Sequence, residues 1–386
     1  MILPDYSGGG ITNLMSSLCR ALGGGDTGYP ELWGLDGKRV AAARNVLLLV
    51  IDGLGYEQLQ KMLPQGHMAD HCAGAITSVC PSTTASAIPT FLTGLAPQQH
   101  GITGWFTYFA ELGAVLSVLP YRTRVGSMPI DAALVSPADL CGAKPFLGKL
   151  PLTAESVMPD WIAGSAFNRA FCAGCGVRVY KNLAGFFKCI LQATKHREQR
   201  KFVYAYWPGF DAIAHQHGVD SQLALAHMQD IDRRIGGLLD SLRGSDSLLL
   251  LTADHGFIDT RPETTVLLSQ HPQLQDMLMA PLCGEPRLAY CYVHPANHRA
   301  FERYVSEHLS DWVDLYPSRQ LVEDGWFGLG KEHPQLQHRI GHYALLAKGD
   351  SKIVGQMPGE EPLRQVGVHG GLSREQMLVP LVVMEA

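Results

Sequence analysis

The sequence predicts an α/β protein whose central sheet is mostly parallel and flanked by helices. Three apolar runs predict buried strands: RNVLLLVID at residues 44–52, KFVYAYWPGFD at residues 201–211 and SLLLLTADH at residues 247–255. Apolar residues follow one another in these runs, as in strands buried on both faces of a parallel sheet. Each run also delivers an acidic side chain at its carboxyl end, where ligands gather in open α/β sheets.

The stretch between the second and third runs predicts the connecting helix. Apolar residues recur there at approximately helical spacing from Leu223 to Leu242, and Gly244 follows as a stop signal. A strand, a helix and a strand in this order predict a parallel α/β unit.

The regular pattern weakens in two segments. Residues 106–200 mix Gly, Pro and short apolar runs, whereas residues 258–340 carry strand-like and helical stretches of their own. We therefore predict a core formed by residues 1–257 and 341–386, with 258–340 inserted as a small cap. Residues 106–200 are a second source of cap elements.

Composition excludes several classes of protein. A formal net charge of -5 over 386 residues argues against a nucleic-acid-binding surface. No apolar run reaches the ~18 residues that suggest a membrane span. The odd number of cysteines, nine, suits a reducing compartment, so we expect a cytoplasmic protein. The oligomeric state stays open at this point.

Three of the acidic residues lie where predicted strands end: Asp52, Asp211 and Asp254. A single aspartate at such a position is explained by capping of the following helix. Three buried carboxylates together are costly unless they are paired or bind metal. The set therefore favours a metal site.

Histidines accompany these carboxylates at spacings typical of metal ligands. His215 follows Asp211 by four residues, which places both on one face of a helical turn, and His255 directly follows Asp254. His369 lies in GVHGG, where the glycines permit a tight turn. Mixed Asp and His ligands suit zinc, with manganese or iron as alternatives.

One further stretch, SVCPSTTASAIPTFLTG at residues 78–94, carries three adjacent hydroxyl residues, Ser82, Thr83 and Thr84. It contains no histidine that could act as a base and no G-x-S-x-G elbow. The stretch alone does not distinguish a hydroxyl-rich turn from a nucleophile.

Five separated motifs span most of the chain and together resemble a known family. They are VIDGLG (50–55), CPSTTASAIPTFLTGLAPQQHGI (80–102), DAIAHQHG (211–218), TADHGF (252–257) and VHGG (368–371). The set resembles the alkaline phosphatase superfamily and, within it, the type I phosphodiesterase/nucleotide pyrophosphatase family. The resemblance implies an alkaline-phosphatase-like fold and a hydrolase that acts on a small-molecule phosphate ester.

The resemblance also implies a ligand set for two divalent cations, zinc or manganese. One cation would be bound by Asp211, His215 and His369. The other would be bound by Asp52, Asp254 and His255, together with the hydroxyl of the nucleophile.

The family nucleophile is a Ser or Thr ten residues before the glycine of a T-G pair, and counting back from Gly94 gives Thr84. A cation lowers the pKa of such a hydroxyl, so no histidine base is needed. If Thr84 begins a helix, the free N–H groups there also favour phosphate. The implied path runs through a covalent phosphothreonine on Thr84, which water then hydrolyses.

The sequence departs from the family at Trp105, because many nucleotide pyrophosphatases have an asparagine there that contacts phosphate. Trp105 is either a stacking surface for a planar group of the substrate or a packed aromatic side chain. No arginine closely follows Thr84, and the sulfatase signature C-x-P-x-R is absent. We therefore expect hydrolysis of phosphoric diesters or nucleotide pyrophosphates. The alternatives are a phosphonate or phosphate monoester hydrolase and, from another class, a non-catalytic metal-binding protein.

Overall fold

A seven-stranded sheet forms the centre of the protein in a computed structural model that describes residues 1–195, 199–361 and 363–386. Its strands lie in the order β2 (Cys72–Thr77), β18 (Leu378–Glu385), β9 (Ser247–Thr252), β1 (Asn45–Ile51), β8 (Lys201–Trp207), β6 (Thr153–Pro159) and β7 (Gly176–Tyr180). The five strands from β9 to β7 are parallel, whereas β18 runs antiparallel to both β2 and β9. The predicted α/β class with a mostly parallel sheet is confirmed.

The three apolar runs form the middle of this sheet. β1 pairs with β8 on one side and with β9 on the other, and every residue of the three strands is buried. Because the three strands are parallel and adjacent, their carboxyl ends lie side by side at one edge of the sheet.

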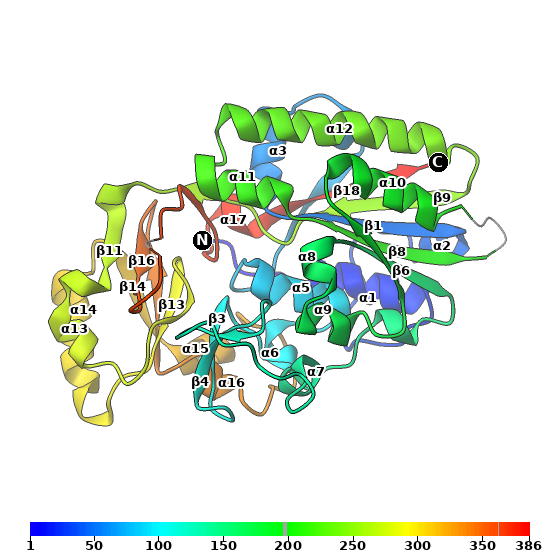
Figure 1. The fold of residues 1–386 in the computed structure, drawn as a ribbon. Coiled ribbons are helices and arrows are strands. Elements are labelled where there is room, and N and C mark those ends of the chain that lie inside the picture. Colours follow the sequence, from blue (N-terminus) through cyan, green and yellow to red (C-terminus); the bar gives the residue numbers. More distant parts are fainter. Residues whose placement is uncertain (196–198, 362) are drawn as a thin grey trace.

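Helices cover both faces of the central sheet (Figure 1). One face carries α3 (Tyr56–Met62), α10 (Leu183–Ala193), α11 (Gly209–His217) and α12 (Gln222–Leu242), and the other carries α1 (Ile11–Ala21) and α5 (Thr84–Thr93). α12 is the helix predicted between the second and third strands. It buries an apolar stripe that includes Ile231, Ile235 and Leu238.

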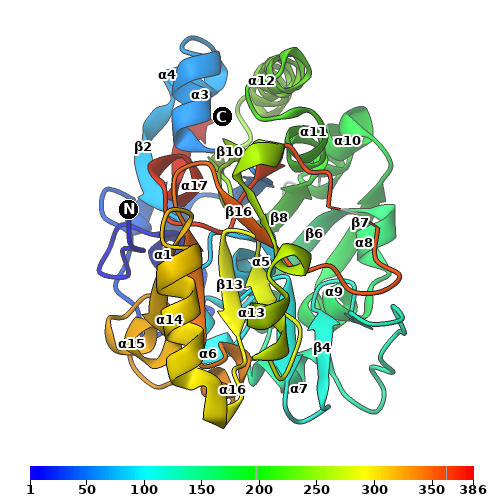
Figure 2. The same cartoon turned by 90° about the vertical axis from the view of Figure 1, so that its left-hand side faces the viewer.

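A second sheet lies beside the first, and all of its strands pair antiparallel (Figure 2). Its order is β14 (Val313–Pro317), β15 (Tyr343–Ala347), β13 (Leu288–Cys291), β12 (Cys283–Glu285), β3 (Phe106–Phe109), β4 (Ala114–Ser117) and β5 (Arg122–Thr123). α14 (His298–His308) connects β13 to β14. The second sheet therefore joins segments from both halves of the chain, and the division into core and cap stays a prediction.

Two short ladders connect the sheets. β10 (Ile258–Asp259) pairs antiparallel with β17 (Gly367–Val368), and β11 (Thr265–Leu267) pairs parallel with β16 (Lys352–Val354). The first ladder holds the GVHGG segment next to the chain that leaves β9.

Short helical segments complete the described chain. They are α2 (Gly37–Ala42), α4 (His67–Asp70), α6 (Pro97–His100), α7 (Pro137–Cys141), η1 (Leu147–Lys149), α8 (Asp160–Ala163), α9 (Ala166–Phe171), η2 (Pro262–Thr264), η3 (Leu268–Gln270), α13 (Pro272–Asp276), η4 (Pro295–Asn297), α15 (Ser318–Glu323), α16 (Leu336–Arg339) and α17 (Arg374–Met377), where η denotes a 3-10 helix. Within the described ranges, no helix combines the length and the apolar character needed to cross a membrane. All nine cysteines are free thiols.

Candidate active site

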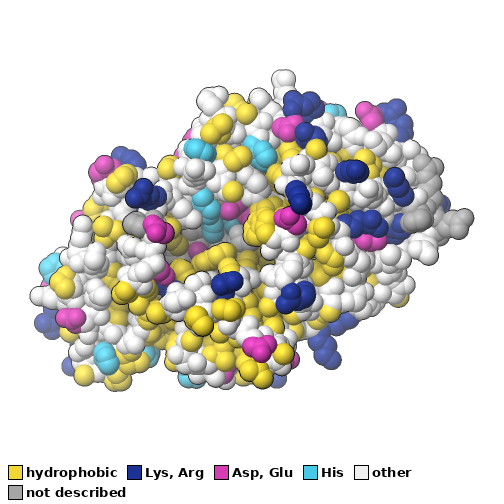
Figure 3. All heavy atoms as spheres, viewed as in Figure 1, with side chains coloured by type: hydrophobic (Ala, Val, Ile, Leu, Met, Phe, Trp, Pro, Cys, Tyr) yellow, Lys and Arg dark blue, Asp and Glu magenta, His cyan; other side chains and the backbone are white. Residues whose placement is uncertain are grey.

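The fold brings the predicted ligands to one place at the carboxyl ends of the central strands. Asp52 follows β1, Asp211 and His215 lie in α11 directly after β8, Asp254 and His255 follow β9, and His369 follows β17. Histidine side chains are visible in a hollow between α11 and the part of the molecule that contains the second sheet (Figure 3). Residues more than 300 positions apart in the sequence thus share one site.

The first cluster consists of Asp52, Asp254 and His255, whose ligand atoms all lie within 4.8 Å of one another. His255 Nε2 is 3.3 Å from Asp52 Oδ1 and 3.5 Å from Asp254 Oδ2. Thr84 Oγ1 lies 3.0 Å from His255 Nε2 and 3.4 Å from Asp52 Oδ1. The hydroxyl of Thr84 therefore borders this cluster.

The second cluster consists of Asp211, His255 and His369, again with ligand atoms within 4.8 Å. His215 lies beside it, because its Nε2 is 3.4 Å from Asp211 Oδ1 and 3.2 Å from His369 Nε2. The family resemblance implies Asp211, His215 and His369 as one ligand set. The geometry brings these three together and adds His255, which stands between the two clusters.

Backbone carbonyls orient two of the imidazoles. His215 Nδ1 lies 2.9 Å from the carbonyl oxygen of Gly367, and His255 Nδ1 lies 3.1 Å from that of Gly256. A proton on Nδ1 satisfies each contact and leaves the Nε2 lone pair directed into the clusters. Metal-binding histidines are commonly fixed in this way.

The carboxylates are positioned by neighbouring groups. Asp254 Oδ1 accepts hydrogen bonds from the backbone N–H groups of Gly53, at 3.0 Å, and of His255, at 3.1 Å. Asp52 Oδ2 accepts a hydrogen bond from the Tyr206 hydroxyl. Gly53 adopts a φ of 77°, and a Cβ there would collide with Phe257, so this turn requires glycine.

The donor set fits bound divalent cations. Asp211 Oδ1 and Asp254 Oδ2 are buried without a hydrogen-bond partner in the described chain. Burial raises the pKa of Asp211 to about 7, and burial together with the charge of Asp52 raises that of Asp254 to about 7. Burial lowers the pKa of His215 to about 4, which keeps this imidazole neutral. Buried anionic oxygens and neutral imidazoles are the ligands that zinc and manganese bind.

These pKa shifts predict that metal binding releases protons. The folded, metal-free chain keeps protons on Asp211 and Asp254 up to about pH 7, well above their ordinary value of 3.8. The stability that these protons give the metal-free fold is fully present below pH 3.8 and is lost as the pH rises through about 7. Cations must displace the same protons, so we expect metal affinity to rise up to about pH 7.

Titration calorimetry in two buffers of different ionisation enthalpy measures this release. We expect more protons per bound zinc at pH 6 than at pH 8. Equal release at both values would contradict the assignment of the two carboxyl groups to the metal centre.

Thr84 is the first residue of α5, and Thr83 occupies the N-cap position in an extended conformation without a capping hydrogen bond from its side chain. The neighbouring hydroxyls are engaged elsewhere: Ser82 Oγ donates to the carbonyl of Gly371 at 2.7 Å, and Thr83 Oγ1 donates to Glu285 Oε1 at 2.7 Å. Of the three adjacent hydroxyls, Thr84 is the one whose contacts are with the Asp/His clusters.

A cavity of about 750 Å³ opens over the site. Thr84, Asp211, His215 and His369 line its floor, and the half-buried Trp105 lines its wall. Trp105 therefore reaches the space that a substrate would occupy. Its role as a stacking surface stays a prediction.

Three residues of this region were not in the predicted set: Tyr206, Glu285 and Arg124. Tyr206 lies within an apolar strand, and nothing in the sequence distinguishes it from a core tyrosine. Glu285 is a buried acid in the otherwise uncharged run LCGEP. This isolated acid is a sequence signal that could have identified Glu285, although the run belongs to none of the family motifs. Burial raises the pKa of Glu285 to about 7.

A mostly parallel sheet with paired Asp/His clusters beside a helix-initiating hydroxyl defines the class of candidate two-cation hydrolases. The model of the family "Type I phosphodiesterase / nucleotide pyrophosphatase" matches residues 46–356. The chain belongs to this family of hydrolases.

Solved structures show the same fold. Murine ectonucleotide pyrophosphatase/phosphodiesterase 5 superposes with a TM-score of 0.65 at 16% identity, covering 87% of each chain. The human protein of the same name gives 0.65 at 18% identity, covering 88% of this chain and 87% of the other. An inactive threonine-to-alanine variant of the murine protein, in complex with AMP, also gives 0.65. No curated protein matches this chain by sequence.

Proposed function

We propose that the protein hydrolyses phosphoric diesters or nucleotide pyrophosphates, with Thr84 as the nucleophile and two divalent cations, zinc or manganese, as cofactors. The observation that carries this proposal is the position of Thr84. Its hydroxyl lies at the start of α5, within 3.4 Å of both Asp52 and His255, and it faces the cavity.

Asp52, Asp254, His255 and Thr84 would hold one cation, and Asp211, His215 and His369 the other. Cations bound there lower the pKa of the threonine hydroxyl and neutralise charge on the phosphoryl oxygens. The ligand atoms converge and their buried oxygens are otherwise unpartnered, which supports this division.

The residues of the chain perform the remaining steps. Thr84 Oγ1 loses its proton and forms a bond to phosphorus, while the bond from phosphorus to the leaving oxygen breaks. Two acceptors for this proton stand beside the hydroxyl: Asp52 Oδ1 lies 3.4 Å and His255 Nε2 lies 3.0 Å from Thr84 Oγ1. The free N–H groups at the start of α5 stabilise the phosphoryl oxygens. Water then attacks the phosphothreonine, which releases the phosphoryl product and restores the hydroxyl.

Family membership supports diesters and pyrophosphates as substrates, and the AMP complex of the murine relative supports a nucleotide as one ligand to test. We also propose a cytoplasmic location, on the strength of nine cysteines without a disulfide.

Hydrolysis of bis-p-nitrophenyl phosphate tests the proposal. We expect zinc-loaded protein to prefer this diester over p-nitrophenyl phosphate by roughly 10²-fold in kcat/KM, because the buried Glu285 near Thr84 opposes the second charge of a monoester. A preference for the monoester, or for a phosphonate substrate, would establish the alternative hydrolase. Absence of turnover with all three in fully metal-loaded protein would overturn the proposed activity.

A further inference from the structure

The side chains that line the cavity carry more negative than positive charge, which is unfavourable for a polyanionic ligand. Beyond the metal-binding residues, its lining contains three carboxylates, Glu285, Glu360 and Glu361, and a single cationic side chain, Arg124. No lysine lines the cavity in the part of the chain that the structure describes. An excess of one sign of charge in a concave site favours ligands of the opposite sign.

Arg124 makes no contact with Glu285, because four of the five N–H groups of its guanidinium bind other residues. Nε and Nη2 bind Glu360 at 2.8 and 3.0 Å, and the guanidinium also donates to the carbonyls of Leu282 and Gly355. It stacks over the ring of Phe106, 4.0 Å from the centroid. Arg124 therefore mainly links segments that line the cavity, and its charge is paired with Glu360.

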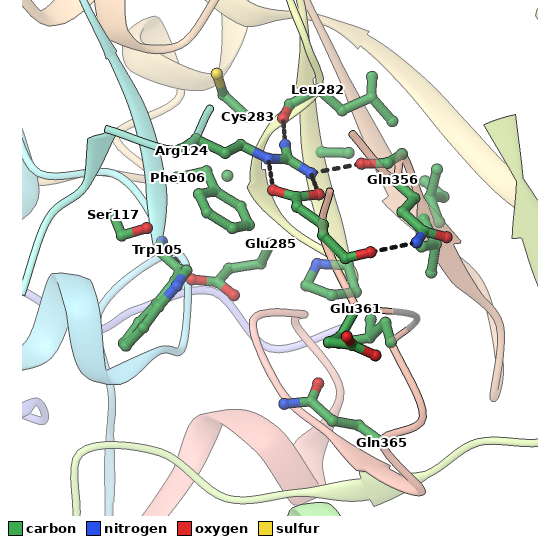
Figure 4. Close-up of a pocket in the computed structure, with 18 of the residues that line it drawn as sticks. Trp105, Phe106, Ser117, Arg124, Leu282, Cys283, Glu285, Gln356, Glu361 and Gln365 are labelled. Carbon is green, nitrogen blue, oxygen red and sulfur yellow. Dashed lines mark hydrogen bonds and ion pairs between the residues drawn. The ribbon is translucent and has the colours of Figure 1, made fainter. Parts of the chain in front are cut away.

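Glu285 is the carboxylate without a cation. It is 6% exposed, and its Oε1 accepts hydrogen bonds from the Thr83 hydroxyl at 2.7 Å and from the Trp105 backbone N–H at 2.6 Å. No described residue donates to Oε2. Figure 4 shows this second oxygen on the open side of the carboxylate, away from Trp105 N. Burial raises the pKa of Glu285 to about 7, so the carboxyl is ionised above neutral pH, and neither of its two donors carries a charge that offsets it.

The surroundings of Glu285 suit an organic cation. Trp105 lines the cavity and is tied to Glu285 through its backbone, and indole rings are the best aromatic partners for ammonium groups. Thr83, which donates to Glu285, directly precedes Thr84 in the chain. A cation bound at Glu285 is therefore near a phosphoryl group held at Thr84.

We propose that Glu285, together with Trp105, forms a subsite for a positively charged ammonium group on the substrate, so that the preferred substrates are phosphodiesters of ammonium-bearing alcohols. This inference rests on the proposed function and narrows its substrate class. The same carboxylate disfavours the additional phosphates of nucleotide pyrophosphates, because like charges at close range cost several kcal/mol.

A pair of substrates that differ only in charge tests the subsite. One is p-nitrophenyl phosphocholine, and the other is its neutral analogue, in which a tert-butyl group replaces trimethylammonium. We expect zinc-loaded protein to prefer the cationic substrate by roughly 10–100-fold in kcat/KM, the range of a charged contact in a desolvated site. Glu285→Gln should abolish the preference while the neutral analogue is hydrolysed at least as fast as before.

Glu361→Gln is the matched control, because it removes the same charge from an exposed position of the same cavity. We expect it to change the preference by less than about 3-fold, since solvent screens exposed charges. An equal effect of the two variants, or equal rates of wild-type protein on both substrates, would overturn the subsite.

A binding measurement separates this inference from the proposed activity. In the Thr84→Ala background, calorimetry compares the affinities for the same two substrates, with and without Glu285→Gln. If the cationic substrate binds more tightly than the neutral one, and Glu285→Gln removes this difference, the subsite is supported even if neither substrate is turned over. Equal binding of the pair refutes the subsite even if both are good substrates.

Discussion

Thr84→Ala should lower kcat for bis-p-nitrophenyl phosphate by on the order of 10⁴-fold or more, because it removes the atom that attacks phosphorus. Metal content should stay at two cations per chain, since the Asp and His ligands are untouched. The measurements are steady-state kinetics and metal analysis of the same preparation. Thr84→Ser, which keeps the hydroxyl, should retain measurable turnover.

The neighbouring hydroxyls provide matched controls for this variant. Ser82→Ala and Thr83→Ala each lose one hydrogen bond to a group outside the Asp/His clusters, to the Gly371 carbonyl or to Glu285. We expect them to stay within about 10-fold of wild-type activity, because each loses a single hydrogen bond and neither hydroxyl contacts the Asp/His clusters. Retained activity in Thr84→Ala, or inactivation by Ser82→Ala instead, would refute the assignment of the nucleophile.

Removal of the metals should have a comparably large effect. Chelation leaves Asp52, Asp211 and Asp254 in one buried site without counter-charges, and it leaves the Thr84 hydroxyl at its ordinary acidity. We expect activity to fall at least 10³-fold and to return with zinc. We also expect the Tm above pH 7 to drop by a few degrees, because metal at 100 times its Kd contributes about 2.7 kcal/mol.

Asp254→Asn tests the same two-cation site by mutation. It keeps the shape of the side chain and removes the negative charge of one candidate ligand. We expect it to lower both metal content and activity while circular dichroism stays unchanged. A well-folded wild-type protein with far fewer than two metals per chain would contradict the two-cation site. Turnover that survives complete chelation would contradict it as well.

The three middle strands of the central sheet were predictable because their signal is local. β1, β8 and β9 are continuous apolar runs, and each is followed by an acid of the candidate site. The second sheet was not predictable, because its pairing is not local. β12 (Cys283–Glu285) lies between β13, which follows it at once, and β3, which precedes it by more than 170 residues. Short strands such as these carry too few side chains to specify a distant partner.

The candidate site was likewise predictable only in part. The candidate ligands and Thr84 could be proposed from the sequence, because each lies within a motif that resembles the family, and the fold brings these residues together. The sequence placed His255 in one ligand set only, whereas its Nε2 lies close to the ligands of both clusters. Glu285 and Tyr206 act through tertiary contacts, to Thr83 and Asp52, that no nearby sequence pattern records.

The position of β18 has a consequence for how the chain folds during synthesis. β18 lies between β2 and β9, and its Leu378 pairs with Thr77, about 300 residues earlier. Until this segment has left the ribosome, β2 has no strand partner and β9 presents an open backbone edge. Unpaired edges of this kind recruit other strands. Before β18 inserts, the nascent chain thus exposes two strand edges that can pair with other chains.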